Sequence, residues 1–190
     1  ADLLTMMYVE AQKVNRPFYM FHLGFPEYSC RYNPIGDYSR ITEVATRIAN
    51  QLPSDGQSAA FRDFVWRFVN VLAKTMEALS IKPNYMNIYK SAANIDDLAG
   101  QFFILILDRE FPNWKAGYDQ FEMPESEQKT ATKTGRNLDT MKLGSYLKSK
   151  NYSESLIDAL NGILSNDRSY FEKLVSSLYP LLEKLTSGDV

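Results

Sequence analysis

Residues 58–80 read SAAFRDFVWRFVNVLAKTMEALS, and this stretch decides the fold. Its apolar residues return every three or four positions, which is the period of an α-helix that buries one broad face. That face carries Phe61, Phe64, Val65, Phe68, Leu72, Met76 and Leu79. A helix so long and so apolar needs other elements to cover it. We therefore place it at the centre of the core and expect Phe61, Phe64, Phe68 and Leu72 to be largely buried.

The segments that flank this helix predict more helices. Upstream, Ile41, Val44, Ala45 and Ile48 mark an amphipathic helix that begins after Asp37. Downstream, helical patterns cover residues 84–91, 94–110, 126–150, 154–164 and 168–186. The region 126–150 is polar and is weakened by Gly135 and Gly144. Since no segment after residue 37 has the pattern of a strand, we expect an all-α helical bundle there.

The first part of the chain has a different character. Residues 2–14 have helical spacing that ends before Pro17, and PFYMFHL, residues 17–23, predicts a short strand. A helix followed by a strand is the second half of a βαβ unit. We expect residues 1–36 to be a lead-in fragment of an α/β domain and residues 37–190 to be an all-α domain. Because the chain starts with Ala1, we also expect a segment of a longer protein; the alternative is a removed initiator methionine.

Composition restricts the function only broadly. Apolar residues make up 45% of the 190 residues, which supports a folded core and argues against disorder. The formal net charge of −2 does not by itself indicate a nucleic-acid partner. One cysteine, Cys30, cannot form an internal disulfide, so a reducing compartment fits best. No apolar run reaches the length of about 18 residues that spans a membrane.

The common catalytic motifs are missing. The sequence has neither the G-x-x-x-x-G-K-[S/T] phosphate loop nor G-x-G-x-x-G, so we expect no enzymatic activity, no catalytic residue and no cofactor. His22 is the single histidine, whereas a zinc site needs about four ligands, so we expect no metal. We interpret His22 as a structural residue and Cys30 as an unreactive one.

One segment is strongly basic. Residues 128–150 hold six basic residues against one acidic residue, a net +5 in a chain whose remainder carries −7. The basic residues are Lys129, Lys133, Arg136, Lys142, Lys148 and Lys150. The first three stand at i, i+4 and i+7, so we expect them on one helical face that contacts DNA phosphates. The alternative is an ordinary solvated face.

A second candidate is Trp66, which lies between Arg62 and Arg67. A tryptophan beside two arginines can stack on a base. The favoured alternative is that Trp66 packs in the core where two helices cross.

A resemblance to a known family covers roughly residues 1–110. The phrases RYNPIG, ITEVATRIANQLP and SAAFRDFVWRFVNV within residues 21–71 resemble the TraD/TraG-like coupling proteins of conjugative type IV secretion systems, most closely those of integrative conjugative elements. The resemblance implies a parent protein that is a hexameric, DNA-translocating ATPase anchored in the bacterial inner membrane. It also implies that an all-α domain interrupts the RecA-like nucleotide-binding domain at the cytoplasmic mouth of the hexamer.

In that interpretation this chain is the cytoplasmic all-α insertion with a short lead-in from the nucleotide domain, and it does not itself contact the membrane. The resemblance implies a domain that receives the transferred substrate. Two hypotheses follow for its partners. The domain binds relaxosome DNA, weakly and without sequence specificity, through the basic segment. Alternatively, it is a docking module for relaxase, accessory or secreted proteins and does not contact DNA.

Overall fold

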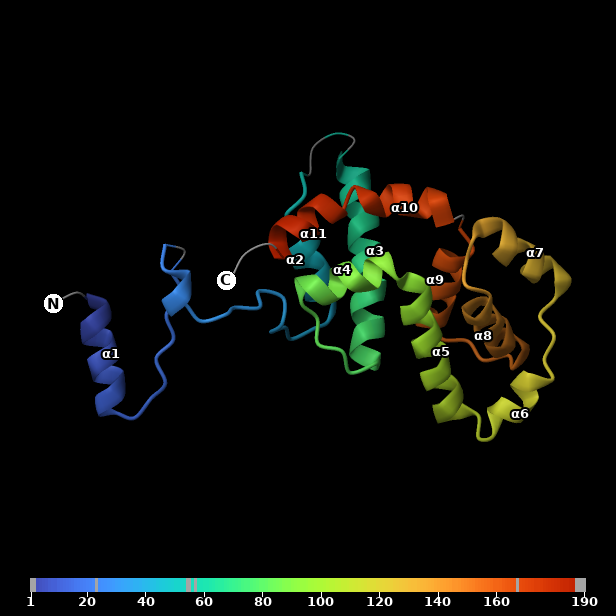
Figure 1. Cartoon of the computed structure of the whole chain (residues 1–190), viewed down its shortest axis with the longest axis horizontal. Coiled ribbons are helices and arrows are strands. Elements are labelled where there is room, and N and C mark those ends of the chain that lie inside the picture. The colour runs from blue at the N-terminus through green and yellow to red at the C-terminus, as the bar shows by residue number, and fades with distance from the viewer. Residues whose placement is uncertain (1–2, 23, 54–55, 57, 167, 187–190) are drawn as a thin grey trace. The chain divides into compact units, whose positions relative to one another are not determined.

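The computed structural model describes residues 3–22, 24–53, 56, 58–166 and 168–186. Over these residues it contains eleven α-helices, one short 3-10 helix and no strand (Figure 1). The all-α prediction is therefore confirmed for the described part of the main body. None of the helices described is long and apolar enough to cross a membrane. The helices are α1 (Leu3–Lys13), η1 (Pro26–Tyr28), α2 (Thr42–Ala49), α3 (Ser58–Ala78), α4 (Tyr85–Ala93), α5 (Ile95–Glu110), α6 (Trp114–Asp119), α7 (Glu125–Thr134), α8 (Leu138–Ser149), α9 (Ser155–Leu164), α10 (Arg168–Ser176) and α11 (Tyr179–Thr186).

The chain divides into two compact units between Pro34 and Ile35. The sequence placed a domain boundary two residues later, after Gly36. Ile35 is fully buried and belongs to the core of the larger unit. The guanidinium of Arg47 on α2 also donates a 2.6 Å hydrogen bond to the carbonyl of Asp37, which ties the start of the larger unit to its first helix.

Helix α3 forms the middle of the larger unit, residues 35–186 (Figure 1). Phe68 and Leu72 are buried as expected, whereas Phe61 and Phe64 are only half-buried. Helix α2 packs along α3. Trp66 packs against the core, and its indole N–H donates a 3.0 Å hydrogen bond to Thr46 Oγ1 on α2, so the interpretation of Trp66 as a packing residue is confirmed.

Helices α5 and α8 approach closely because glycines stand at their crossing. A Cβ atom added at Gly144 would lie 2.6 Å from Asn161 Oδ1 and 3.2 Å from Phe103 Cε2. Such distances leave no room for a side chain, since protein interiors are close-packed. In the sequence Gly144 suggested only a weak helix. In the structure it lets α8 pack against α5 and α9.

Two predicted helical regions differ from the structure, and one α-helix of the described residues was not predicted. The region 126–150 is two helices, because Gly135 adopts a left-handed conformation (φ +67°) that ends α7. The region 168–186 is likewise two helices, α10 and α11. Helix α6 was not predicted, since its six residues are too few for a clear period.

The smaller unit has no strand in its described part. The prediction of a strand over 17–23 is wrong for residues 17–22, which are irregular; residue 23 lies outside the described residues. A strand requires a neighbour for its backbone groups. Here the Cys30 N–H donates a 2.7 Å hydrogen bond to the Met20 carbonyl, and the His22 N–H donates one of 2.8 Å to the Ser29 hydroxyl in place of a strand partner. Helix α1 has no buried residue.

Candidate nucleic-acid interface

Helices α7 and α8, the turn between them and the residue after α8 carry the basic residues that the sequence singled out. The two helices pack against each other, and Lys148 near the end of α8 lies 3.7 Å from Glu127 near the start of α7, so they run in opposite directions. Ala131 is the buried residue of α7. Lys129 and Lys133, two positions before and after it, are exposed on the opposite side of the helix.

Ion pairs with described residues hold the side chains of Lys129 and Lys133 only weakly or not at all. Lys129 Nζ lies 2.6 Å from Glu125 Oε1, with both side chains more than 70% exposed. Exposed pairs of this kind contribute about 0–1 kcal/mol. Lys133 forms no ion pair with any described residue. Phosphate groups can therefore compete for these amines at low cost.

Arg136 does not belong to this surface, and its predicted place beside Lys129 and Lys133 is wrong. Because Gly135 ends α7, Arg136 no longer follows the helical period and turns inward. Its side chain is 1% exposed, and its Nη1 lies 3.0 Å from Asp96 Oδ2. It donates two further hydrogen bonds of 3.2 Å to the carbonyls of Ile163 and Asn166. Its guanidinium carbon lies 5.0 Å from the ring centre of Phe171.

Asp96 fixes the turn between α7 and α8. Its second carboxylate oxygen accepts a 2.9 Å hydrogen bond from the Asn137 N–H, and its carbonyl accepts one of 3.1 Å from Thr140 Oγ1. Asp96 lies in the first turn of α5, where a helix dipole favours negative charge. It also orients the hairpin that presents the lysines.

Lys142 on α8 and Lys150 directly after it lie beside a cluster of aromatic rings that sequence reasoning missed. We call Trp114, Tyr118, Phe121, Tyr146, Lys142 and Lys150 the aromatic–lysine surface. Lys142 Nζ lies 4.5 Å from the ring centre of Tyr118, and Lys150 Nζ lies 4.7 Å from that of Tyr146. The spacing of the residues could have predicted this cluster. Trp114, Tyr118 and Phe121 stand at i, i+4 and i+7, which puts three rings on one side of a helical segment.

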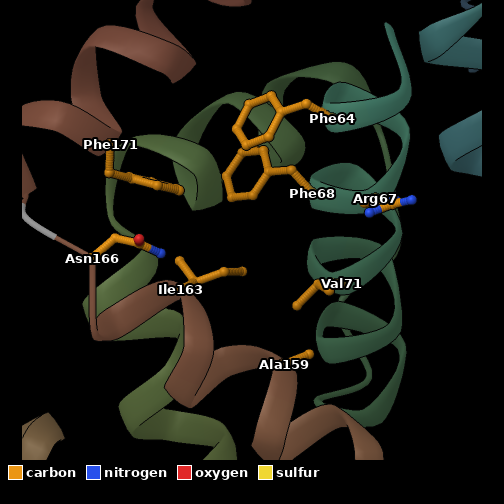
Figure 2. Close-up of a pocket in the computed structure, with 8 residues that line it drawn as sticks. All are labelled: Phe64, Arg67, Phe68, Val71, Ala159, Ile163, Asn166 and Phe171. Atoms are coloured by element: carbon orange, nitrogen blue, oxygen red, sulfur yellow. The ribbon is translucent and has the colours of Figure 1, made fainter. Parts of the chain in front are cut away.

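A separate apolar cleft of about 290 Å³ lies between α3, α9 and α10. Figure 2 shows the rings of Phe64 and Phe68 facing Phe171 and Ile163 across it. Phe68 and Phe171 meet edge to face with ring centres 5.2 Å apart. Arg67 lies on the outer side of α3, away from Phe171 (Figure 2). The cleft can accept an apolar side chain, and Arg67 is the charged residue among those that line it.

Among the described residues, no three histidine, cysteine, aspartate or glutamate side chains converge in a way that could hold a metal ion. His22 accepts a 3.0 Å hydrogen bond at Nδ1 from the Gly24 N–H and packs its ring against Phe25. The comparisons with known proteins add nothing to this site, because no family model, curated protein or solved structure matches the chain.

Proposed function

We propose that this chain is the substrate-recruiting all-α domain of a conjugative type IV coupling protein, and that it contacts relaxosome DNA. In this proposal residues 1–36 are a lead-in fragment of a RecA-like nucleotide-binding domain that the all-α domain interrupts. The rest of that domain and the inner-membrane anchor belong to the parent protein, a homohexameric DNA-translocating ATPase of a plasmid or integrative conjugative element. The all-α domain lies in the cytoplasm at the mouth of the hexamer.

Exposed apolar side chains in the smaller unit support the proposal that residues 1–36 belong to a larger domain. Helix α1 buries none of its residues, and the large apolar side chains of Leu3, Met6, Met7, Tyr19 and Tyr28 are each 55% or more exposed. Exposed apolar surface of this extent marks a site that another protein surface covers. A nucleotide-binding domain that continues beyond this chain would supply such a cover.

The observation that carries the DNA contact is the group of exposed lysines on the α7–α8 hairpin. Lys129, Lys133 and Lys148 are exposed there, and Lys142 and Lys150 lie on the same helix pair or directly after it. Lysines without buried partners can neutralise phosphates and release counterions. Because the lysines are few, we expect weak, sequence-independent binding. Non-specific dissociation constants run from about 10⁻⁴ to 10⁻⁶ M, and one copy of the chain should lie near 10⁻⁴ M. Six copies in a hexamer would gain avidity.

A titration of fluorescently labelled oligonucleotides tests this contact. The chain should bind at low salt and lose affinity as salt rises, because released counterions oppose binding. A variant with Lys129→Glu, Lys133→Glu and Lys148→Glu should lose the binding and keep its melting temperature. The matched control is Lys74→Glu, Lys82→Glu and Lys90→Glu, which changes the same charge at exposed positions on α3, α4 and the loop between them. Equal binding by both variants would argue against the hairpin as the contact.

The apolar cleft favours a second candidate, a docking module for relaxase, accessory or secreted proteins. Protein interfaces bury apolar and aromatic anchors, and Phe64 at the edge of the cleft is half-buried. If the unmodified chain binds no oligonucleotide at low salt, this second function replaces the first. A Phe64→Ser substitution should then weaken binding to the purified relaxase of the same element.

A further inference from the structure

The rings of the aromatic–lysine surface form one continuous cluster. The ring centre of Tyr146 lies 5.6 Å from that of Tyr118 and 5.2 Å from that of Phe121, and Trp114 lies 5.5 Å from Tyr118. Tyr146 is buried and its hydroxyl donates a 3.2 Å hydrogen bond to the Trp114 carbonyl, so it anchors the cluster. Trp114, Tyr118 and Phe121 are partly exposed. The cluster thus offers three rings to a ligand.

Three lysines accompany these rings. In addition to Lys142 and Lys150, Lys115 Nζ lies 6.0 Å from the ring centre of Trp114. None of the three forms an ion pair with a described residue. A lysine over an exposed ring gains about 0.5–1 kcal/mol, whereas a nucleic-acid base stacked on an aromatic side chain gains about 1–3 kcal/mol. A base can therefore displace the amine from the ring, and the freed amine can pair with a phosphate.

We infer that the aromatic–lysine surface binds single-stranded nucleic acid, with bases stacked on Trp114, Tyr118 and Phe121 and phosphates paired with the lysines. This inference rests on the proposed contact with DNA and names its substrate. In a duplex, the faces of the bases are already stacked on each other. Only an unpaired strand presents base faces to protein rings, and aromatic rings interleaved with cations are the usual platform for it.

Acidic neighbours limit the affinity of this surface. Burial raises the pKa of the Tyr118 phenol, and the nearby carboxylates of Asp139 and Asp119 raise that pKa further. These two carboxylates repel phosphates from the same region. Asp139→Asn should therefore tighten the binding of a single strand.

Tryptophan fluorescence tests the inference directly. The chain has two tryptophans, so Trp66→Phe leaves Trp114 as the sole reporter. The probes are an oligo-dT of about 15 nucleotides, within the usual site sizes, a duplex of the same length and inorganic polyphosphate. We expect oligo-dT to quench Trp114 and to bind at least about fivefold tighter than the duplex, the factor that corresponds to about one stacked base. Polyphosphate should cause no quenching, because it has charge but no bases.

Substitutions at Tyr118 separate stacking from packing. Tyr118→Phe keeps the ring and should bind oligo-dT normally. Tyr118→Leu keeps apolar bulk without a ring and should lose about fivefold or more. Tyr89→Leu on α4 is the matched control and should leave binding unchanged. Melting curves check that each variant folds. The quenching of Trp114 is measured with all rings of this surface unchanged, so that result does not depend on how the Tyr118 variants fold.

The outcomes distinguish the inference from the proposed function. If oligo-dT and the duplex bind equally and Tyr118→Leu has no effect, the single-strand inference fails while the DNA contact stands. If polyphosphate competes as well as oligo-dT, the surface recognises charge alone and the inference also fails. If no nucleic acid binds at low salt, both fail.

Discussion

Arg136 Nη1 lies 3.0 Å from Asp96 Oδ2, and this ion pair joins the start of α5 to the turn between α7 and α8. The arginine side chain is 1% exposed and that of the aspartate 15%. A pair so deeply buried is costly to break, because the remaining charge loses its partner without gaining full hydration. Arg136 is thus a structural residue, although the sequence grouped it with the lysines that were expected to contact DNA.

Arg136→Met should destabilise the larger unit by about 3 kcal/mol or more, as expected for removal of one partner of a buried pair. Lys133→Met should change the free energy of unfolding by no more than about 0.5 kcal/mol, since it lies on the surface. Urea denaturation followed by circular dichroism measures both. Similar losses in the two variants would contradict the different roles assigned to them.

Two glycines in the bundle should respond to alanine with opposite signs. Gly144→Ala should destabilise by about 1–3 kcal/mol, because its Cβ would overlap Asn161 and Phe103. Gly162→Ala on α9 should stabilise by about 0.5–1 kcal/mol, because nothing lies within 4 Å of its Cβ and alanine favours the helix. Thermal melting of the two variants beside the parent measures the difference. A stabilised Gly144→Ala variant would show that α5 and α8 do not cross as closely as described.

Ionisation of Tyr118 and Tyr179 should lower the free energy of unfolding at alkaline pH. Burial raises the pKa of Tyr118 and Tyr179 above the ordinary value of 10.0, and neighbouring carboxylates add to the effect. Their protonated phenols therefore stabilise the folded protein fully below about pH 10, and this contribution is lost as pH rises through the folded-state pKa values. Between about pH 8 and pH 11, on either side of the ordinary tyrosine value, the unfolding free energy should drop less in a Tyr118→Phe, Tyr179→Phe variant than in the parent. Equal drops would contradict this assignment.

The chain should not hydrolyse ATP. It lacks a phosphate loop, whose backbone amides and lysine hold the transferred phosphate in enzymes of the proposed parent class. Release of inorganic phosphate from magnesium ATP should stay at the background rate of the buffer. Turnover that persists through repeated purification and follows the protein in the elution profile would refute the expectation.

Local sequence pattern predicted the helices whose apolar period is long. The helix at 58–80 is recognisable because Phe68, Leu72 and Met76 repeat over several turns, and all three are buried in the structure. Helix α6 was not predicted, because six residues are too few to show a helical period of apolar residues. The rings of Trp114 and Tyr118 were therefore not recognised as part of a surface.

The burial of Arg136 could not be predicted from its spacing. Its partner Asp96 is 40 residues away, and the turn at Gly135 decides which way the side chain points. The prediction of a strand over residues 17–23 is wrong for residues 17–22 for a related reason. Aromatic and apolar residues fit a strand only where another strand is available for pairing, and the described residues contain none.

Transfer of DNA from donor to recipient cells tests the central proposal most directly. The Lys129→Glu, Lys133→Glu, Lys148→Glu substitutions are placed in the gene of the parent protein, and the Lys74→Glu, Lys82→Glu, Lys90→Glu set serves as the control at equal protein level. If this chain delivers DNA through the α7–α8 hairpin, transfer should fall by about tenfold or more in the first strain, the change that corresponds to about 1.4 kcal/mol. The control strain should transfer normally. Normal transfer by both strains, or an equal fall in both, would contradict the proposal.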